Sequence, residues 1–227
     1  MGDAIDPGFV DAARMRTVAV TGGDALGWLD ALVTADLRGI AAGEARRSLL
    51  LSPTGAVLAT FTVVGADDGL LLFQDPGESR AIGDLLARYV LSADVRLAEG
   101  GPQPGEGPGD AWRIAHRAPR VGTDITDGDL PVEAGLDDLV DRDKGCFLGQ
   151  EAVARVRNTG RPRRILLRLR SDAPLEAGVD VEADGAIVGA LTSADASEPG
   201  SVAFARIRWD AREADLRTTD GSPLLPA

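Results

Sequence analysis

The chain has few of the residue types that build metal centres, disulfide frameworks and membrane spans. Its 227 residues include one cysteine, Cys146, and one histidine. A single cysteine excludes an internal disulfide, and one cysteine with one histidine are too few for a zinc or iron–sulfur site within the chain. No uncharged apolar run approaches the roughly 18 residues that a transmembrane helix needs. We therefore expect no permanently bound metal and no membrane contact.

The chain also has no excess of positive charge, because 36 acidic residues outnumber 24 basic ones and the net charge is −12. A chain without a global positive field is a poor general nucleic-acid binder. The first residues are acidic and show no apolar signal region, so we expect a cytoplasmic protein. Positive charge gathers only in residues 142–170, the basic stripe, where nine basic residues accompany two acidic ones. The stripe is either a solvated face or a receptor for an anionic ligand.

Lysine is the scarcest charged residue, since Lys144 stands alone beside 23 arginines. A composition that uses arginine wherever either residue serves indicates that Lys144 occupies a position where arginine does not serve. Arginine is a planar fork, whereas lysine is a compact point charge. Cys146 lies two residues further on, and a neighbouring cation and a helix N-terminus both lower a thiol pKa. Cys146 is therefore a candidate reactive residue, and the alternative is a buried structural cysteine.

The first 98 residues are predicted to form an α/β lobe. The expected strands are 17–20, 47–51, 56–64, 70–73 and 94–98. One helix is expected to begin after Asp24, and a second is expected over residues 78–91. Hairpin turns separate the middle strands, so a mixed α+β fold is favoured over a parallel doubly wound sheet.

The rest of the chain divides into three stretches. Residues 99–111 are rich in Gly and Pro and are typical of a linker. Residues 112–162, the remainder of a second lobe, include a strand-like segment at Trp112–Ile114 and a short helix over 150–157. From residue 163 to residue 227, apolar residues alternate at period two between short turns, which predicts a small antiparallel barrel.

Two short segments carry the candidate site residues. The first is 144–151 (KGCFLGQE), in which Gly145 and Gly149 allow backbone geometries closed to other residues and let a ligand approach the main chain. The second is 131–135 (PVEAG), where a buried Glu133 would need paired N–H donors, as on an aminopyrimidine ring or a guanidinium.

The first of these segments resembles the K-G-C-[FY]-x-G-Q-E signature of the YgfZ family, folate-binding proteins related to the glycine-cleavage T-protein (aminomethyltransferase). Further matches lie at 18–25 (VAVTGGDA), 49–55 (LLLSPTG), 113–114 (RI), 131–135 (PVEAG) and 189–193 (GALTS). The resemblance covers nearly the whole chain. It implies packed α/β lobes around a central cavity that holds tetrahydrofolate, with a C-terminal antiparallel β-barrel. It also implies a role in the assembly or repair of iron–sulfur proteins, including enzymes that modify tRNA.

The same resemblance implies roles for individual residues. Glu133 would hold the pterin ring, and Arg113 would support the pocket. Lys144 and Cys146 would form the signature loop as the candidate catalytic pair. The other residues assigned to the ligand are Gly145, Gly149, Gln150 and Glu151. The implied partners are folate, whose glutamate tail would meet the basic stripe, and iron–sulfur client or assembly proteins. We expect a monomer.

Three departures from the family's pattern affect this interpretation. T-proteins carry an Asp pair in the hairpin, one member of which acts in methylene transfer to folate, and the matching positions here are Ala59 and Thr60. Arg117 stands where the family has Gly. The linker at 99–111 replaces several tens of residues, which predicts a truncated lobe. Two alternatives to a folate-dependent accessory factor remain, a T-protein-type one-carbon transferase and an interaction scaffold that binds no folate.

Overall fold

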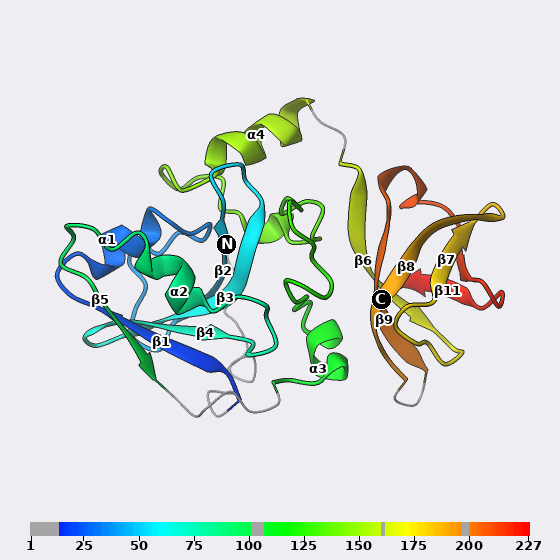
Figure 1. Ribbon diagram of the computed structural model, residues 1–227, viewed down its shortest axis with the longest axis horizontal. Coiled ribbons are helices and arrows are strands. Elements are labelled where there is room, and N and C mark those ends of the chain that lie inside the picture. Colours follow the sequence, from blue (N-terminus) through cyan, green and yellow to red (C-terminus); the bar gives the residue numbers. More distant parts are fainter. Residues whose placement is uncertain (1–13, 101–106, 160–161, 197–199) are drawn as a thin grey trace.

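The computed structural model describes residues 14–100, 107–159, 162–196 and 200–227 of the chain. Figure 1 shows an antiparallel sheet with two helices over one face, a central stretch of loops and short helices, and a C-terminal barrel. No helix within these ranges combines the length and the apolar composition that crossing a bilayer requires.

The first lobe is built on a five-stranded antiparallel sheet in the order β2-β3-β4-β1-β5. Its strands are β1 (Arg16–Thr21), β2 (Ala45–Leu51), β3 (Val57–Ala66), β4 (Gly69–Gln74) and β5 (Arg96–Gly100). Tight turns join β2, β3 and β4, so strands adjacent in sequence pair with one another. The predicted strands and the α+β class are confirmed.

Helices α1 (Ala25–Asp30) and α2 (Ile82–Ala87) pack on one face of this sheet. The helix predicted over 78–91 is shorter than expected. The Gln74 side chain accepts a hydrogen bond from the N–H of Ile82 at 2.8 Å, which sets the start of α2. The preceding turn stays irregular, and the Glu78 side chain reaches back from it to Thr60 in β3.

Strand β2 has neighbours on both faces of the sheet. Leu50 belongs to the core under α1 and α2, whereas Leu49 and Leu51 pack against the central stretch of the chain. This alternation follows the period of two in a strand, and it explains why the end of β2 is apolar at every position. The central stretch contains η2 (Asp137–Leu139) and α4 (Gln150–Thr159), of which α4 confirms the predicted short helix.

The strand predicted at Trp112–Ile114 is wrong, because these residues lie in helix α3 (Asp110–Ala115). The N–H of Arg113 donates to the carbonyl of Gly109, the i to i−4 bond of an α-helix. Three residues are too few to distinguish a period of two from one of 3.6. The predicted linker contributes its first two residues to β5 and its last two to α3, and residues 101–106 lie outside the described ranges.

Arg117 follows α3 with a φ of +51°, in the left-handed region that favours glycine. Its carbonyl accepts a hydrogen bond from Arg47 at 2.7 Å, and its guanidinium lies 3.2 Å from the Asp138 carboxylate. The position where the resembled family has Gly is thus a strained one here, and the ion pair is exposed and weak.

The C-terminal residues form a closed barrel in the order β10-β11-β6-β9-β8-β7, which confirms the prediction. Its elements are β6 (Arg164–Ser171), β7 (Asp180–Ala183), β8 (Ala186–Asp195), β9 (Ser201–Arg208), η3 (Trp209–Ala211), β10 (Leu216–Thr218) and β11 (Pro223–Pro226). Alternate residues of β6 and β9 fill the interior. Leu166 and Phe204 point outward and pack on Ile114 of α3, which joins the barrel to the rest of the molecule.

Candidate functional site

Lys144 is buried, and its ammonium group binds the chain that follows α1. Nζ donates to the carbonyl oxygens of Asp30 (2.6 Å), Val33 (2.9 Å) and Ala35 (2.7 Å), and it lies 3.1 Å from the Asp30 carboxylate. Burial lowers the pKa of Lys144, and the Asp30 carboxylate opposes that effect. Four acceptors converge on one nitrogen, a geometry that a planar guanidinium does not match. This explains why the single lysine of the chain lies here.

Cys146 lies at the surface of the molecule. The sequence paired this thiol with Lys144, but the Lys144 ammonium is buried against the chain after α1. The expected activation of the thiol by that cation has no contact to support it. Reactivity of Cys146 stays a prediction, and the alternative of a buried structural cysteine is wrong.

Gly149 lets the signature loop pack against the turn between β2 and β3. Its φ is +83°, and a Cβ there would lie 2.5 Å from the carbonyl oxygen of Ser52. In the β2–β3 turn, a Cβ added to Gly55 would lie 3.0 Å from the Cβ of Ala152. Gly145 differs, because it has no left-handed φ and faces open space. Two of the motifs that carry the resemblance therefore meet in space through the backbone of Gly149.

The contrast between the two glycines gives a matched test of stability. Gly149→Ala is expected to lower the free energy of unfolding by about 2–4 kcal/mol, because the new Cβ meets a backbone oxygen in a left-handed conformation. Gly145→Ala is expected to change it by less than about 0.5 kcal/mol. Urea denaturation of both variants measures the difference. Equal stabilities would contradict the close packing of the loop on Ser52.

Gln150 and Glu151 are the first residues of α4. Glu151 is exposed in the first turn, where a carboxylate interacts favourably with the helix dipole. Gln150 is half-buried. Both residues are thus placed by the start of a helix, and their assignment to a ligand stays a prediction.

Glu133 has the paired N–H donors that the sequence required, and both are main-chain groups. One carboxylate oxygen accepts from the N–H of Arg163 at 3.1 Å, and the other accepts from the N–H of Leu130 at 3.1 Å. The Glu133 carbonyl also accepts from the N–H of Leu166 at 2.8 Å. Glu133 therefore ties its own loop to the start of the barrel, and a contact with a pterin ring stays a prediction.

Arg113 is 1% exposed and connects α3 with the barrel. Its guanidinium donates to the Asp124 carboxylate at 2.7 Å, to Ser193 Oγ at 2.8 Å and to Asp110 at 2.6 Å. The second oxygen of Asp124 accepts from Thr192 and Ser193 of β8. Sequence reasoning missed Asp124, although a buried arginine requires such a counter-ion. Arg113 therefore joins α3 to the barrel, and its support of a ligand pocket stays a prediction.

The described residues enclose a small space beside the first sheet, and the central cavity that the resemblance implies for folate stays a prediction. Between the sheet and the segment that contains Trp112, the open space is about 30 Å³, room for a water molecule or two. Thr60 lines it and hydrogen-bonds the buried Glu78, and Gln74 donates to the same carboxyl group. Burial raises the pKa of Glu78 to about 8, although these donors act in the opposite direction. This space does not fit a pterin ring.

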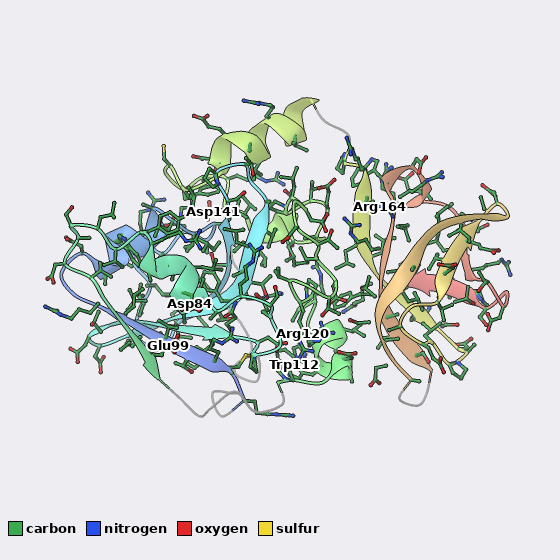
Figure 2. All side chains as sticks on the ribbon, in the orientation of Figure 1. Asp84, Glu99, Trp112, Arg120, Asp141 and Arg164 are labelled. Carbon is green, nitrogen blue, oxygen red and sulfur yellow. The ribbon has the colours of Figure 1, made fainter. Side chains whose placement is uncertain are left out.

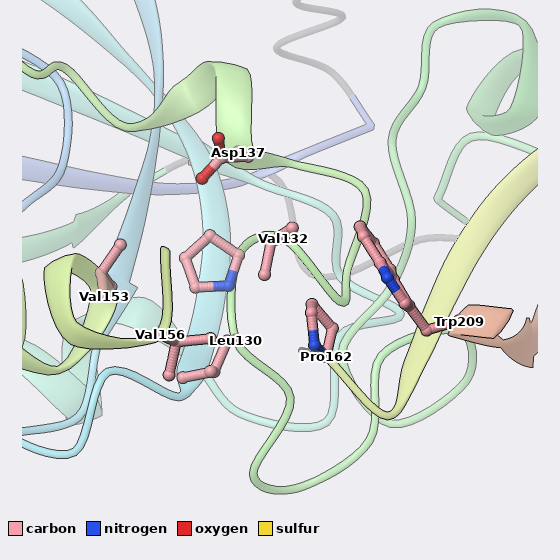
Figure 3. Close-up of a pocket in the computed structure, with 8 residues that line it drawn as sticks. Leu130, Val132, Asp137, Val153, Val156, Pro162 and Trp209 are labelled. Atoms are coloured by element: carbon pink, nitrogen blue, oxygen red, sulfur yellow. The ribbon is translucent and has the colours of Figure 1, made fainter. Parts of the chain in front are cut away.

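A larger cleft lies between α4 and the barrel, and we call it the interlobe cleft. It measures about 160 Å³ and is shown in Figure 3. Its lining residues are Leu130, Pro131, Val132, Asp137, Val153, Val156, Pro162 and Trp209. Its walls are mostly apolar, with one carboxylate and one indole.

The basic stripe does not form one continuous surface. Lys144 is buried, Arg142 pairs with Asp137 at 3.2 Å, and Arg168 donates to two main-chain carbonyls. Arg164, labelled in Figure 2, lines an open groove of about 420 Å³ on the barrel. Arginines 206 and 208 line the same groove and pair with Asp129 and Asp210. The stripe is therefore partly structural, and its exposed arginines lie before and within α4 (Arg142 and Arg155) as well as at the start of the barrel (Arg163 and Arg164).

Comparisons with known proteins identify the class of fold. The chain is 30% identical over 178 residues to an aminomethyltransferase of Nostoc sp., which covers 78% of this chain and 44% of the relative. It is 29% identical over 179 residues to an aminomethyltransferase of Rippkaea orientalis, with 78% and 45% covered. The chain thus spans less than half the length of these relatives. No family model matches it.

A solved structure shows the same architecture. Glycine cleavage system aminomethyltransferase T from Bartonella henselae superposes with a TM-score of 0.77 at 18% identity, which covers 95% of this chain and 83% of that one. The chain therefore has the α+β fold of the aminomethyltransferase T-proteins, with the C-terminal barrel that the resemblance implied.

Proposed function

We propose that this chain is a folate-binding accessory protein of the YgfZ type, which supports iron–sulfur cluster assembly or repair and, through it, enzymes that modify tRNA. The observation that carries the proposal is the placement of Cys146 on the signature loop. Lys144 ties that loop to the chain after α1, and Gly149 packs it on the β2–β3 turn. A well-fixed loop with an exposed thiol favours contact with a partner molecule.

A one-carbon transferase is the second candidate, because the relatives are named aminomethyltransferases. General acid–base catalysis needs a titratable side chain within hydrogen-bond reach of the reacting molecule, and the two hairpin positions where T-proteins have Asp offer none. Ala59 is fully buried in the core under α1 and α2, and Thr60 faces a space of about 30 Å³. We therefore expect no turnover of an aminomethyl donor.

Anaerobic calorimetric titration with tetrahydrofolate, run beside an aminomethyl-donor turnover assay, separates the candidates. The expected result is saturable binding in the micromolar range without turnover. Folate-dependent turnover would establish the transferase instead. A folded protein that binds no tetrahydrofolate would favour the interaction scaffold.

The thiol is tested separately by complementation of a deletion strain. Cys146→Ala is expected to fail, while its melting temperature stays close to that of the wild type because the side chain is exposed. Full complementation by Cys146→Ala would remove the thiol from the proposed function and leave folate binding to be judged by titration alone.

A further inference from the structure

Two arginines lie opposite one another at the start of the barrel. Arg164 begins β6 and is the direct antiparallel partner of Arg208 in β9. Both side chains are exposed and line the open groove on the barrel, and Figure 2 labels Arg164. Like charges directly opposite on neighbouring strands destabilise a sheet. The pair therefore costs the barrel stability unless an anionic group lies against it.

The described residues neutralise one member of this pair. Arg208 binds the Asp210 carboxylate through Nε at 3.0 Å and through Nη2 at 3.1 Å. Arg164 and its neighbour Arg163 are exposed, and neither guanidinium has an ion pair within the described ranges. In a chain of net charge −12, this local excess of positive charge attracts an acidic group.

The interlobe cleft opens beside these arginines. Pro162 lines the cleft and directly precedes Arg163, and Trp209 lines it and directly follows Arg208. Figure 3 shows Trp209 and Pro162 on the side of the cleft opposite α4. The N–H of Trp209 donates to the carbonyl of Arg163 at 3.0 Å, which holds the two chain segments together. An apolar hollow and a group of cations therefore share one rim.

The volume of the cleft suits a single side chain. It measures about 160 Å³, whereas sites for drug-sized ligands measure about 300–1,000 Å³. Its walls are mostly apolar, and its carboxylate, Asp137, pairs with Arg142 at 3.2 Å. Such a space accepts one large apolar side chain, such as leucine or phenylalanine, from a molecule whose other contacts lie outside the cleft.

The walls of the cleft are held in place without a partner. The Glu133 side chain accepts from the N–H of Arg163, and its carbonyl accepts from the N–H of Leu166, so its loop is tied to β6. The guanidinium of Arg212 lies over the Trp209 ring, 4.4 Å from the centroid. A preformed surface loses little conformational entropy on binding, and Trp and Arg are the side chains that most often dominate binding at protein interfaces.

An acidic protein segment matches both features of this surface. Its carboxylates would meet Arg163 and Arg164, and one apolar side chain would enter the cleft. A nucleic acid matches only the first feature. Its phosphates would also approach a chain of net charge −12, and an apolar hollow does not select them.

We propose that the interlobe cleft and the start of the barrel form a docking surface for an acidic segment of a partner protein. One apolar side chain of that segment lies in the cleft, and its carboxylates lie on Arg163, Arg164 and Arg208. The docking surface goes beyond the proposed function, because it depends neither on folate binding nor on Cys146.

The probe is a phage-displayed library of short random peptides, selected against the full chain. Enriched peptides are expected to carry one large apolar residue flanked by Asp or Glu. The most enriched peptide is then synthesised with a fluorescent label, and its Kd is measured by anisotropy. Failure to enrich any peptide, or enrichment of peptides without acidic residues, would overturn the proposal.

Arg164→Glu is expected to weaken binding of the labelled peptide at least about 10-fold in about 0.1 M salt, and the loss should shrink as salt screens the charges. Arg170→Glu is the matched control. It makes the same charge change at an exposed side chain of the same strand, about 20 Å further along β6. It is expected to leave the Kd within about twofold, and equal effects of the two variants would contradict the docking surface.

Val156→Ser tests the cleft itself and is expected to weaken binding about fivefold at every salt concentration, since it removes apolar contact. Ala154→Ser, at an exposed position of α4 outside the cleft lining, should leave the Kd unchanged. Thermal melting followed by circular dichroism confirms that each variant is folded. Unchanged binding in Val156→Ser would overturn the placement of the apolar side chain. A thymidine oligonucleotide that displaces the peptide with equal affinity would assign the surface to nucleic acid instead.

Discussion

Lys144→Met is expected to lower the free energy of unfolding by about 3–5 kcal/mol. The substitution keeps an unbranched side chain of similar length but removes the ammonium. The carbonyl groups of Asp30, Val33 and Ala35 and the Asp30 carboxylate then lose a shared buried donor. Each acceptor left unpaired away from water costs about 1–3 kcal/mol. Guanidinium chloride unfolding followed by circular dichroism measures the loss.

Lys144→Arg is expected to recover only part of that loss, because a planar fork cannot place its donors on four acceptors that surround one nitrogen. Arg142→Gln is the control. Arg142 pairs with Asp137 near the surface, and such a pair contributes at most about 1 kcal/mol to the free energy of unfolding. Wild-type stability in Lys144→Arg would contradict the explanation given for the single lysine.

Glu78→Gln removes a titratable group and is expected to change how the free energy of unfolding depends on pH. Burial raises the pKa of Glu78 from 4.5 to about 8 in the folded protein. An acid with a raised folded pKa contributes stability that is fully present below its unfolded pKa and is lost as the pH rises through the folded value. Relative to the wild type, Glu78→Gln should therefore gain on the order of 4 kcal/mol between about pH 5 and about pH 9.

The measurement is a series of urea unfolding curves for both proteins across that pH range. The amide oxygen introduced by Glu78→Gln is able to accept from Thr60 Oγ1 as the carboxyl oxygen does, so the fold is expected to persist. Asp84→Asn, an exposed change in the first turn of α2, is the control and should run parallel to the wild type. Parallel curves for Glu78→Gln would show that Glu78 stays ionised in the folded protein.

Local patterns were enough to predict most elements of secondary structure. The alternation after residue 163 predicted the barrel, and the Pro- and Gly-containing turns predicted the β2–β3–β4 meander. Both patterns are short-range, because side-chain direction in a strand repeats every two residues and a tight turn is set by a few residues. The composition also predicted that Lys144, the single lysine of the chain, occupies a position where arginine does not serve.

The candidate site depended on contacts that no local pattern encodes. Lys144 binds carbonyl groups 109–114 positions earlier in the chain, and Arg113 meets Ser193 80 positions later. The resemblance gave Lys144 a place in the candidate catalytic loop and Arg113 a place at the ligand pocket; in the fold both residues also join distant elements.

By itself, the sequence determined the antiparallel hairpins, the barrel and the need for a lysine at position 144. Only the tertiary structure decided that Cys146 is exposed, that Glu133 binds main-chain N–H groups, and that a cleft forms beside Asp137 and Trp209. The physical reason is that a cavity is the volume left between packed elements. Its position depends on how closely distant segments approach, whereas hairpins and strands depend on neighbouring residues.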